Sequence, residues 1–89
     1  MAVLVKITNR GASLAMYDQL SSRLLPEAKR QAGFHIHMCY PLDDGFVVSE
    51  VWDSADQHRA WYEGHIRPNI PPDAHPEFEV VELHNLVTK

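Results

Sequence analysis

Apolar and polar residues alternate along four segments of the chain. Each segment is rich in β-branched or aromatic residues, which favours strands over helices. The predicted strands cover Val3–Thr8, Phe34–Tyr40, Phe46–Asp53 and Phe78–Val87. The pair Asp44-Gly45 between the second and third of them is typical of a tight hairpin turn.

Two other segments repeat their apolar residues at helical spacing. Ser13 is a typical N-cap, and the helix after it has an apolar stripe at Leu14, Tyr17, Leu20 and Leu24. Pro26 is expected to end or kink this helix. The stretch Ser54-Ala55-Asp56-Gln57 fits a capping box and predicts a second helix over Ala55–Ile66.

The order of these elements is β-α-β-β-α-β, because the proline-rich stretch Pro68–Pro76 is predicted to be a loop. This order is that of the ferredoxin-like fold, an α+β architecture with two helices on one face of an antiparallel four-stranded sheet. A chain of 89 residues has the length of one domain, so we expect a single domain over residues 1–89.

The alternation sorts the strand residues into two sets, one of which should lie beneath the helices. A hairpin at Asp44-Gly45 would place Cys39 near Glu50 and His37 near Trp52. Since an ionised carboxylate is costly to bury, we expect Glu50 and the histidines on the face away from the helices. The set expected beneath the helices is Val3, Val5, Ile7, Ile36, Met38, Tyr40, Val47, Ser49, Val51, Val81, Leu83, Asn85 and Val87.

The other set mixes apolar, charged and aromatic residues: Leu4, Lys6, Thr8, His35, His37, Cys39, Val48, Glu50, Trp52, Val80, Glu82 and His84. Such a face must be covered by another surface that leaves room for some water. We therefore expect a second copy of the chain laid sheet against sheet, which makes the protein a homodimeric α+β barrel with a ligand pocket.

Charge and composition exclude several classes of protein. The net charge is −4 and no Lys/Arg cluster is present, which argues against nucleic acid as a partner. The apolar run Ala2–Val5 is too short for a signal peptide or a membrane span, and the one cysteine cannot form an internal disulfide. We expect a cytoplasmic protein without a membrane partner. The chain has no glycine-rich phosphate loop or dinucleotide fingerprint, so no cofactor is predicted.

The runs Gly33-Phe34-His35-Ile36-His37 and Asp44 to Ser54, followed by Trp61, resemble the dimeric α/β-barrel proteins of the antibiotic biosynthesis monooxygenase type. This resemblance covers almost the whole chain. It implies a ferredoxin-like subunit, a homodimer formed through the sheets, and a pocket beside the helices. Some members of the family oxidise polycyclic aromatic substrates with molecular oxygen and no cofactor. Others bind and open haem, and many have no known activity.

The resemblance makes a cofactor-independent monooxygenase for an aromatic or polyketide-like substrate the leading hypothesis. His37 and His65 are the candidates for moving the substrate's proton, because an imidazole titrates near neutral pH. The side chains expected to bind the substrate are Trp52, Trp61, Tyr62, His58, Glu50 and His84. Core packing is the alternative explanation for the two tryptophans.

A haem or metal protein is the first alternative, and a non-catalytic ligand-binding module is the second. The haem-opening relatives use an asparagine on the first strand, a tryptophan on the second helix and a histidine after it. Trp61 matches their tryptophan by its spacing from Trp52. Asn9 lies at the end of the first predicted strand, and Pro71 stands at the position of their histidine. His35 and His37 could share a metal ion, but we predict none.

Overall fold

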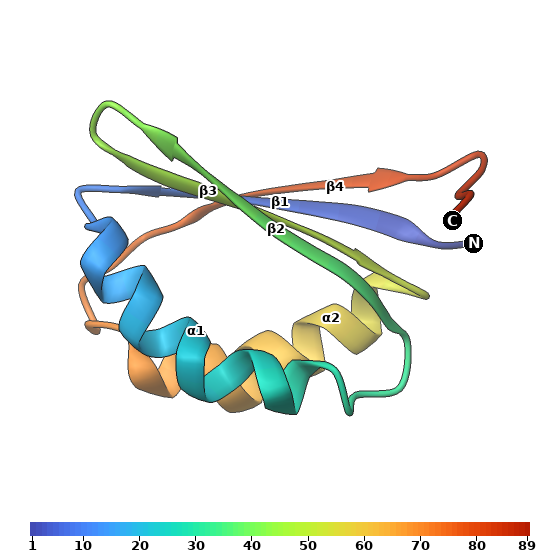
Figure 1. Ribbon diagram of the computed structural model, residues 1–89, viewed down its shortest axis with the longest axis horizontal. Helices are drawn as coiled ribbons and strands as arrows, with labels where there is room; N and C mark the ends of the chain where they lie inside the picture. The colour runs from blue at the N-terminus through green and yellow to red at the C-terminus, as the bar shows by residue number, and fades with distance from the viewer.

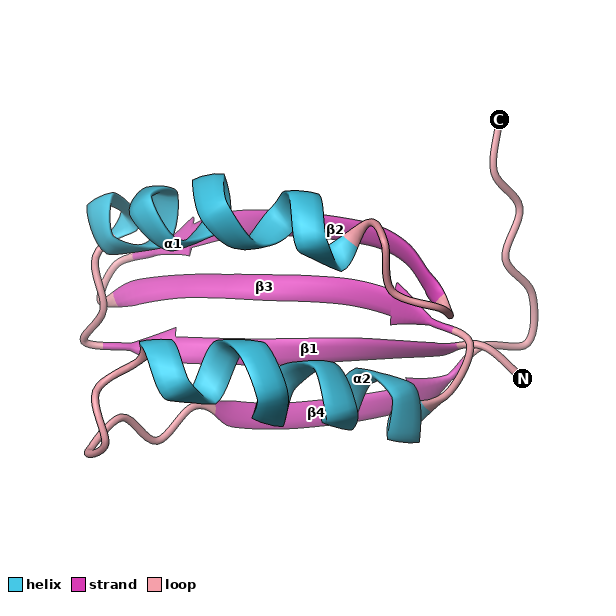
Figure 2. Ribbon diagram, turned by 90° about the horizontal axis from the view of Figure 1, so that it is seen from below, coloured by secondary structure: helices cyan, strands magenta, loops and turns pink.

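The computed structural model describes residues 1–89 as one four-stranded antiparallel sheet with its helices on one face (Figures 1 and 2). The sheet order is β2-β3-β1-β4. The elements are β1 (Val3–Arg10), α1 (Leu14–Ala28), β2 (Phe34–Leu42), β3 (Gly45–Trp52), α2 (Ala55–Trp61), the π-helical turn η1 (Tyr62–Ile66), the 3₁₀ turn η2 (Arg67–Asn69) and β4 (Glu77–Glu82). The predicted element order and the ferredoxin-like fold class are confirmed. None of the helices is both long and apolar enough to cross a membrane.

Both helices begin at the predicted caps. The Ser13 hydroxyl accepts a hydrogen bond from the Met16 amide at 3.1 Å, and the Ser54 hydroxyl accepts one from the Gln57 amide at 3.2 Å. The first helix continues past Pro26 and ends at Ala28. The second helix changes to π-helical geometry after Trp61, a wider turn that recurs at functional sites in other proteins.

The last strand is shorter than the predicted Phe78–Val87 and ends at Glu82. It pairs with β1, whose first paired residue, Val3, lies opposite Glu82. One further hydrogen bond joins the Leu83 amide to the Ala2 carbonyl at 2.9 Å.

The hairpin between β2 and β3 turns one residue earlier than predicted, at Asp43-Asp44, and pairs Leu42 with Gly45. This moves the register by two residues, so the predicted pairs of Cys39 with Glu50 and His37 with Trp52 are wrong. His37 instead lies opposite Glu50, and Cys39 lies opposite Val48. A shift of two residues keeps these side chains on one common face.

A β-bulge between Phe34 and Ile36 interrupts the alternation at the start of β2. The extra residue in the bulge is His35, whose ring nitrogen Nε2 lies 2.6 Å from Asp53 on the surface. The bulge therefore separates His35 from His37, although their spacing suggests that they share a face. No group of three or more His, Cys, Asp or Glu residues is arranged to hold a metal ion.

The face of the sheet that carries His37 and Glu50 lies beneath the helices. This reverses our prediction for β2, β3 and β4. Val5 on β1 pairs with Glu50 on one side and with Val80 on the other, so these residues share a face with His37. Val5 is fully buried in the core cluster under the helices. Only the β1 residues of the expected inner set are correctly placed.

The error has a physical cause. Alternation separates the two faces of each strand, but it does not say which face of one strand continues which face of the next. The cost of burying a carboxylate favours the outer face for Glu50. Glu50 is nevertheless buried, with 5% of its surface exposed. Hydrogen bonds from neighbouring side chains offset the cost in this case, as described below.

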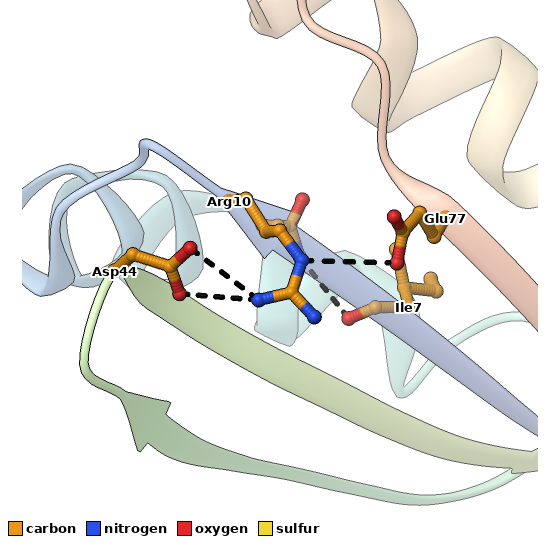
Figure 3. A network of polar contacts seen from close by, with 5 residues as sticks. Ile7, Arg10, Asp44 and Glu77 are labelled. Carbon is orange, nitrogen blue, oxygen red and sulfur yellow. Dashed lines mark hydrogen bonds and ion pairs between the residues drawn. The ribbon is translucent and has the colours of Figure 1, made fainter.

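Arg10 on β1 contacts both β4 and the turn between β2 and β3, at one end of the sheet (Figure 3). Its Nη1 donates to both carboxylate oxygens of Asp44 at 3.2 and 3.3 Å, and its Nε lies 3.9 Å from Glu77. All three side chains are more than half exposed, so each pair contributes at most about 1 kcal/mol to stability.

Candidate functional site

A cavity lies between α1, the sheet and the second helical segment. Most of its lining is apolar, and its polar side chains are Asn9, Tyr17, Ser21, His37, Glu50, His58 and Tyr62. The cavity volume is about 90 Å³, and the cavity is partly open to solvent. An engineered apolar cavity of about 150 Å³ binds benzene, so a ligand of more than one ring would also occupy the mouth.

Three side chains from three elements form a hydrogen-bonded row along the cavity. The Tyr17 hydroxyl on α1 lies 2.6 Å from Nε2 of His37 on β2. Nδ1 of the same imidazole lies 2.6 Å from Oε2 of Glu50 on β3. Both distances are slightly shorter than the usual range of about 2.7–3.2 Å. For His37 and Glu50 the short distance agrees with a charged carboxylate as the acceptor.

The row defines which group donates each proton. A carboxylate only accepts hydrogen bonds, so Nδ1–H of His37 donates to Glu50. In the neutral imidazole Nε2 is then an acceptor, and the Tyr17 hydroxyl donates to it. Burial raises the pKa of Tyr17 above its usual value, which keeps this hydroxyl protonated at neutral pH.

Glu50 accepts a second hydrogen bond from a side chain that does not line the cavity. The indole Nε1–H of Trp52 donates to Oε1 of Glu50 at 3.0 Å, and the Trp52 side chain is fully buried. Trp52 does not line the cavity. Its contact in the site is with the carboxylate and not with a ligand, which differs from the substrate-binding role expected for it.

His58 on α2 faces the same carboxylate without reaching it. Its Nε2 lies 3.8 Å from Oε1 of Glu50 and is the one buried side-chain nitrogen or oxygen without a hydrogen-bond partner. Burial lowers the pKa of His58, while the nearby Glu50 raises it by less. His58 is therefore neutral at pH 7 and lines the cavity as an aromatic ring.

Trp61 and Tyr62 form the aromatic wall contributed by the second helical segment. His65 stacks on Trp61 with ring centroids 4.3 Å apart, and its Nδ1 lies 3.3 Å from the Trp61 carbonyl oxygen. The wider π-helical turn brings Ile66 to the cavity instead of His65. His65 therefore packs against Trp61 and does not line the cavity itself.

The structure thus brings together five of the predicted residues around one cavity: His37, Glu50, His58, Trp61 and Tyr62. Trp52 contacts Glu50 and His65 contacts Trp61, but neither lines the cavity. His84 lies outside it, in the exposed segment that follows β4.

Sequence reasoning missed Tyr17, which we assigned only to the apolar stripe of the first helix. Its hydroxyl is the polar tip of an otherwise aliphatic stripe, and this was the signal available. Asn9 also lines the cavity, at the end of β1, where its side chain donates to the Ile7 carbonyl at 3.2 Å.

The arrangement resembles a general-base relay in its chemistry. An imidazole held by a carboxylate can accept a proton at its other nitrogen, and the carboxylate stabilises the imidazolium that forms. The apolar walls lower the local dielectric constant, which strengthens these electrostatic contacts. The site can therefore take a proton from a small, flat, weakly acidic molecule.

Comparisons with known proteins support this fold and leave the activity open. Neither a family model nor a curated protein matches the sequence. Among solved structures, the chain is similar to SnoaB, a cofactor-independent oxygenase from Streptomyces nogalater, with a TM-score of 0.68 and 17% identity over 99% of this chain and 97% of that one.

Two further structures show the same similarity. One is ActVA-Orf6, a monooxygenase of Streptomyces coelicolor in complex with nanaomycin D (TM-score 0.60, 14% identity, 99% of this chain and 91% of that one). The other is MhuD, a haem-degrader of Mycobacterium tuberculosis, solved as a variant with two manganese protoporphyrin IX molecules per active site (TM-score 0.66, 16% identity, 100% of both chains). The ferredoxin-like fold is therefore confirmed for this chain.

The side chains of the cavity do not fit haem well. Both ring nitrogens of His37 already make hydrogen bonds, and Nε2 of His58 is buried beside Glu50. Asn9 and Trp61 both line the cavity, but His37 would lose a hydrogen bond on binding iron, and Nε2 of His58 lies buried 3.8 Å from the Glu50 carboxylate.

Proposed function

We propose that the protein is a cofactor-independent monooxygenase that acts on a small phenol-like or quinol molecule of aromatic or polyketide-like type. The observation that carries this proposal is the His37–Glu50 pair, hydrogen-bonded at 2.6 Å and facing a mostly apolar cavity. Two of the similar structures are described as oxygenases, which supports the reaction class.

In this proposal the substrate ring lies against Trp61 and Tyr62, with its acidic hydroxyl directed at the His37 end of the cavity. Aromatic side chains favour a flat ligand through burial of apolar area. Removal of the hydroxyl proton gives an electron-rich anion, which then reacts directly with oxygen. The imidazolium of His37, stabilised by Glu50, balances the charge of this anion.

Oxygen uptake by the metal-free protein tests the proposal. Anthrone and a simple quinol are the substrates, and chelator-treated protein is compared with its His37→Gln variant. We expect uptake above the buffer rate that falls at least about a hundredfold in the variant, because a general base contributes roughly 10²–10⁴-fold. A rate equal to buffer for both substrates, in a sample that still binds a phenol, would indicate the non-catalytic ligand-binding module instead.

We also propose that two copies form a homodimer through the face of the sheet opposite the helices. This face carries three large side chains that are 43–47% exposed: Met38, Tyr40 and Val81. Leu4 and Ile36, which are partly exposed, lie in the same row as Val81 and extend the apolar area of this face. Apolar area of this kind is typically covered by a partner. A placement in the cytoplasm remains a prediction.

A further inference from the structure

The proposed function leaves open which atom meets the substrate's proton, and the row of hydrogen bonds in the cavity points to an answer. The basic nitrogen of His37, Nε2, is the expected acceptor, but the Tyr17 hydroxyl already occupies it at 2.6 Å. The two rings are also nearly parallel, with 13° between their planes and centroids 5.9 Å apart. A substrate hydroxyl therefore cannot reach Nε2 unless Tyr17 moves away.

We infer that Tyr17 is the catalytic residue that takes the substrate's proton, by passing its own phenolic proton to His37. This inference rests on the proposed function, because it assigns the first acceptor in that deprotonation. The Tyr17 oxygen has lone pairs that remain free when its hydrogen points at Nε2. It lines the cavity from α1, so a substrate hydroxyl in the cavity can donate to it.

The protons balance without any further reactant. The substrate O–H bond breaks and its proton bonds to the Tyr17 oxygen, while the Tyr17 O–H bond breaks and that proton bonds to Nε2 of His37. Tyr17 ends as a neutral phenol, His37 as an imidazolium, and the substrate as an anion. Glu50 stays a carboxylate and accepts from Nδ1–H of the imidazolium.

The surroundings of Tyr17 support this direction of transfer. Phe46 packs against its ring at 5.3 Å between centroids, which holds the phenol in place beside His37. Burial raises the pKa of Tyr17, so a lasting phenolate is unfavourable and the proton must be handed on as the new one arrives. In a serine–histidine–carboxylate triad the hydroxyl likewise gives its proton to the histidine, although its oxygen there bonds to a substrate carbon instead of a substrate proton.

The ionisation of a bound phenol tests the inference without requiring turnover. The probe is 1-naphthol, whose anion absorbs at longer wavelength than the neutral form. It is added at a pH about one unit below its solution pKa, where roughly a tenth of it is ionised in water. The proteins are wild type, Tyr17→Phe and the control Tyr40→Phe. The control removes a hydroxyl from the face of the sheet opposite the cavity and keeps the apolar ring that the proposed dimer would cover.

We expect the ionised fraction of bound probe to rise at least threefold in wild type and in Tyr40→Phe. In Tyr17→Phe it should return to the solution value. The dissociation constant should change by no more than about tenfold, the effect of one neutral hydrogen bond. Equal ionisation in Tyr17→Phe and wild type would overturn the inference and leave the proposed function standing. Binding without extra ionisation in wild type would also overturn it.

If wild type does not bind 1-naphthol at all, the proposed function fails and the inference fails with it. A second readout then still reports on the hydrogen bond itself. The ¹⁵N resonance of His37 Nε2 should shift toward the value of an unbonded acceptor in Tyr17→Phe and stay unchanged in Tyr40→Phe. An unchanged resonance in Tyr17→Phe would show that the hydroxyl does not contact this nitrogen.

Discussion

Replacing Glu50 with glutamine tests whether this buried carboxylate accepts two hydrogen bonds. Glu50 accepts from Nδ1 of His37 at 2.6 Å and from Nε1 of Trp52 at 3.0 Å, and both donors point at oxygens. A carboxamide has one oxygen and one NH₂ group. If the NH₂ group faces Trp52, the indole N–H loses its acceptor. If it faces His37, the imidazole proton moves to Nε2, and the Tyr17 hydroxyl loses its acceptor instead.

The expected loss of stability follows from these contacts. A buried donor left without a partner costs about 1–3 kcal/mol, and the bond that remains loses its charge-assisted part, worth about 1 kcal/mol. Two effects offset this: the neutral side chain is easier to bury, and its NH₂ group can donate to Nε2 of His58, now 3.8 Å from the carboxylate. We therefore expect Glu50→Gln to lower the free energy of unfolding by about 1–3 kcal/mol.

Urea denaturation followed by tryptophan fluorescence measures this difference, and thermal unfolding should show a midpoint lowered by about 4–8 °C per kcal/mol. The matched control is Glu79→Gln on the exposed strand β4, which should change stability by less than about 0.5 kcal/mol. If Glu50→Gln is as stable as the control, the carboxylate does not accept both bonds, and the arrangement of Glu50 beneath the helices is wrong.

Three further predictions concern pH, the turn and the outer face. Because burial lowers the pKa of His58 below its ordinary 6.5, the unfolded chain binds a proton that the folded chain resists, so the free energy of unfolding should decrease as pH falls below about 6.5. His58→Gln should remove that part of the dependence and His35→Gln, at an exposed ring, should retain it. A Cβ at Gly45 would lie 1.9 Å from the Asn9 carbonyl oxygen, so Gly45→Ala should cost at least about 2 kcal/mol, whereas Gly64→Ala, which meets nothing within 4 Å, should be neutral by the same denaturation assay. Met38→Glu on the exposed sheet face should produce monomers in sedimentation velocity, whereas Gln19→Glu, on the exposed side of α1, should sediment like wild type; a wild-type protein that is monomeric at micromolar concentration contradicts the proposed dimer.

The sequence predicts the elements of this protein well because their signals are local. Ser13 and Ser54 cap their helices through hydrogen bonds within three residues, and period-two alternation needs only the strand itself. The element order then limits the topology to few choices, and the ferredoxin-like one is found.

The orientation of the strands was not predictable in the same way. The assignment of Glu50 to the outer face depended on a general cost of burial, and that cost is offset here by donors from Trp52 and His37, which are far from obvious as partners in the sequence. The bulge at His35 likewise has no clear local signal, yet it decides that His35 and His37 do not act together.

The candidate site depends on the same non-local contacts. His37 and Glu50 could be selected from their residue types, but their pairing required the register of β2 and β3. Tyr17 reaches His37 only because α1 packs over β2, as the arrangement in Figure 2 shows, and no spacing along the chain links the two residues. The change to a π-helical turn after Trp61 moves His65 to the side of Trp61 and was not indicated by the helical stripe.

A crystal structure of the protein with bound 1-naphthol is the most direct test of the central claim, that this cavity binds a phenol and directs its hydroxyl at the row formed by Tyr17, His37 and Glu50. We predict the naphthol ring against Trp61 and Tyr62, with its oxygen about 2.5–3.0 Å from the Tyr17 hydroxyl, the usual range for such a hydrogen bond. A probe found only on the outer face of the sheet, or in the cavity with its oxygen directed away from Tyr17, would contradict the account.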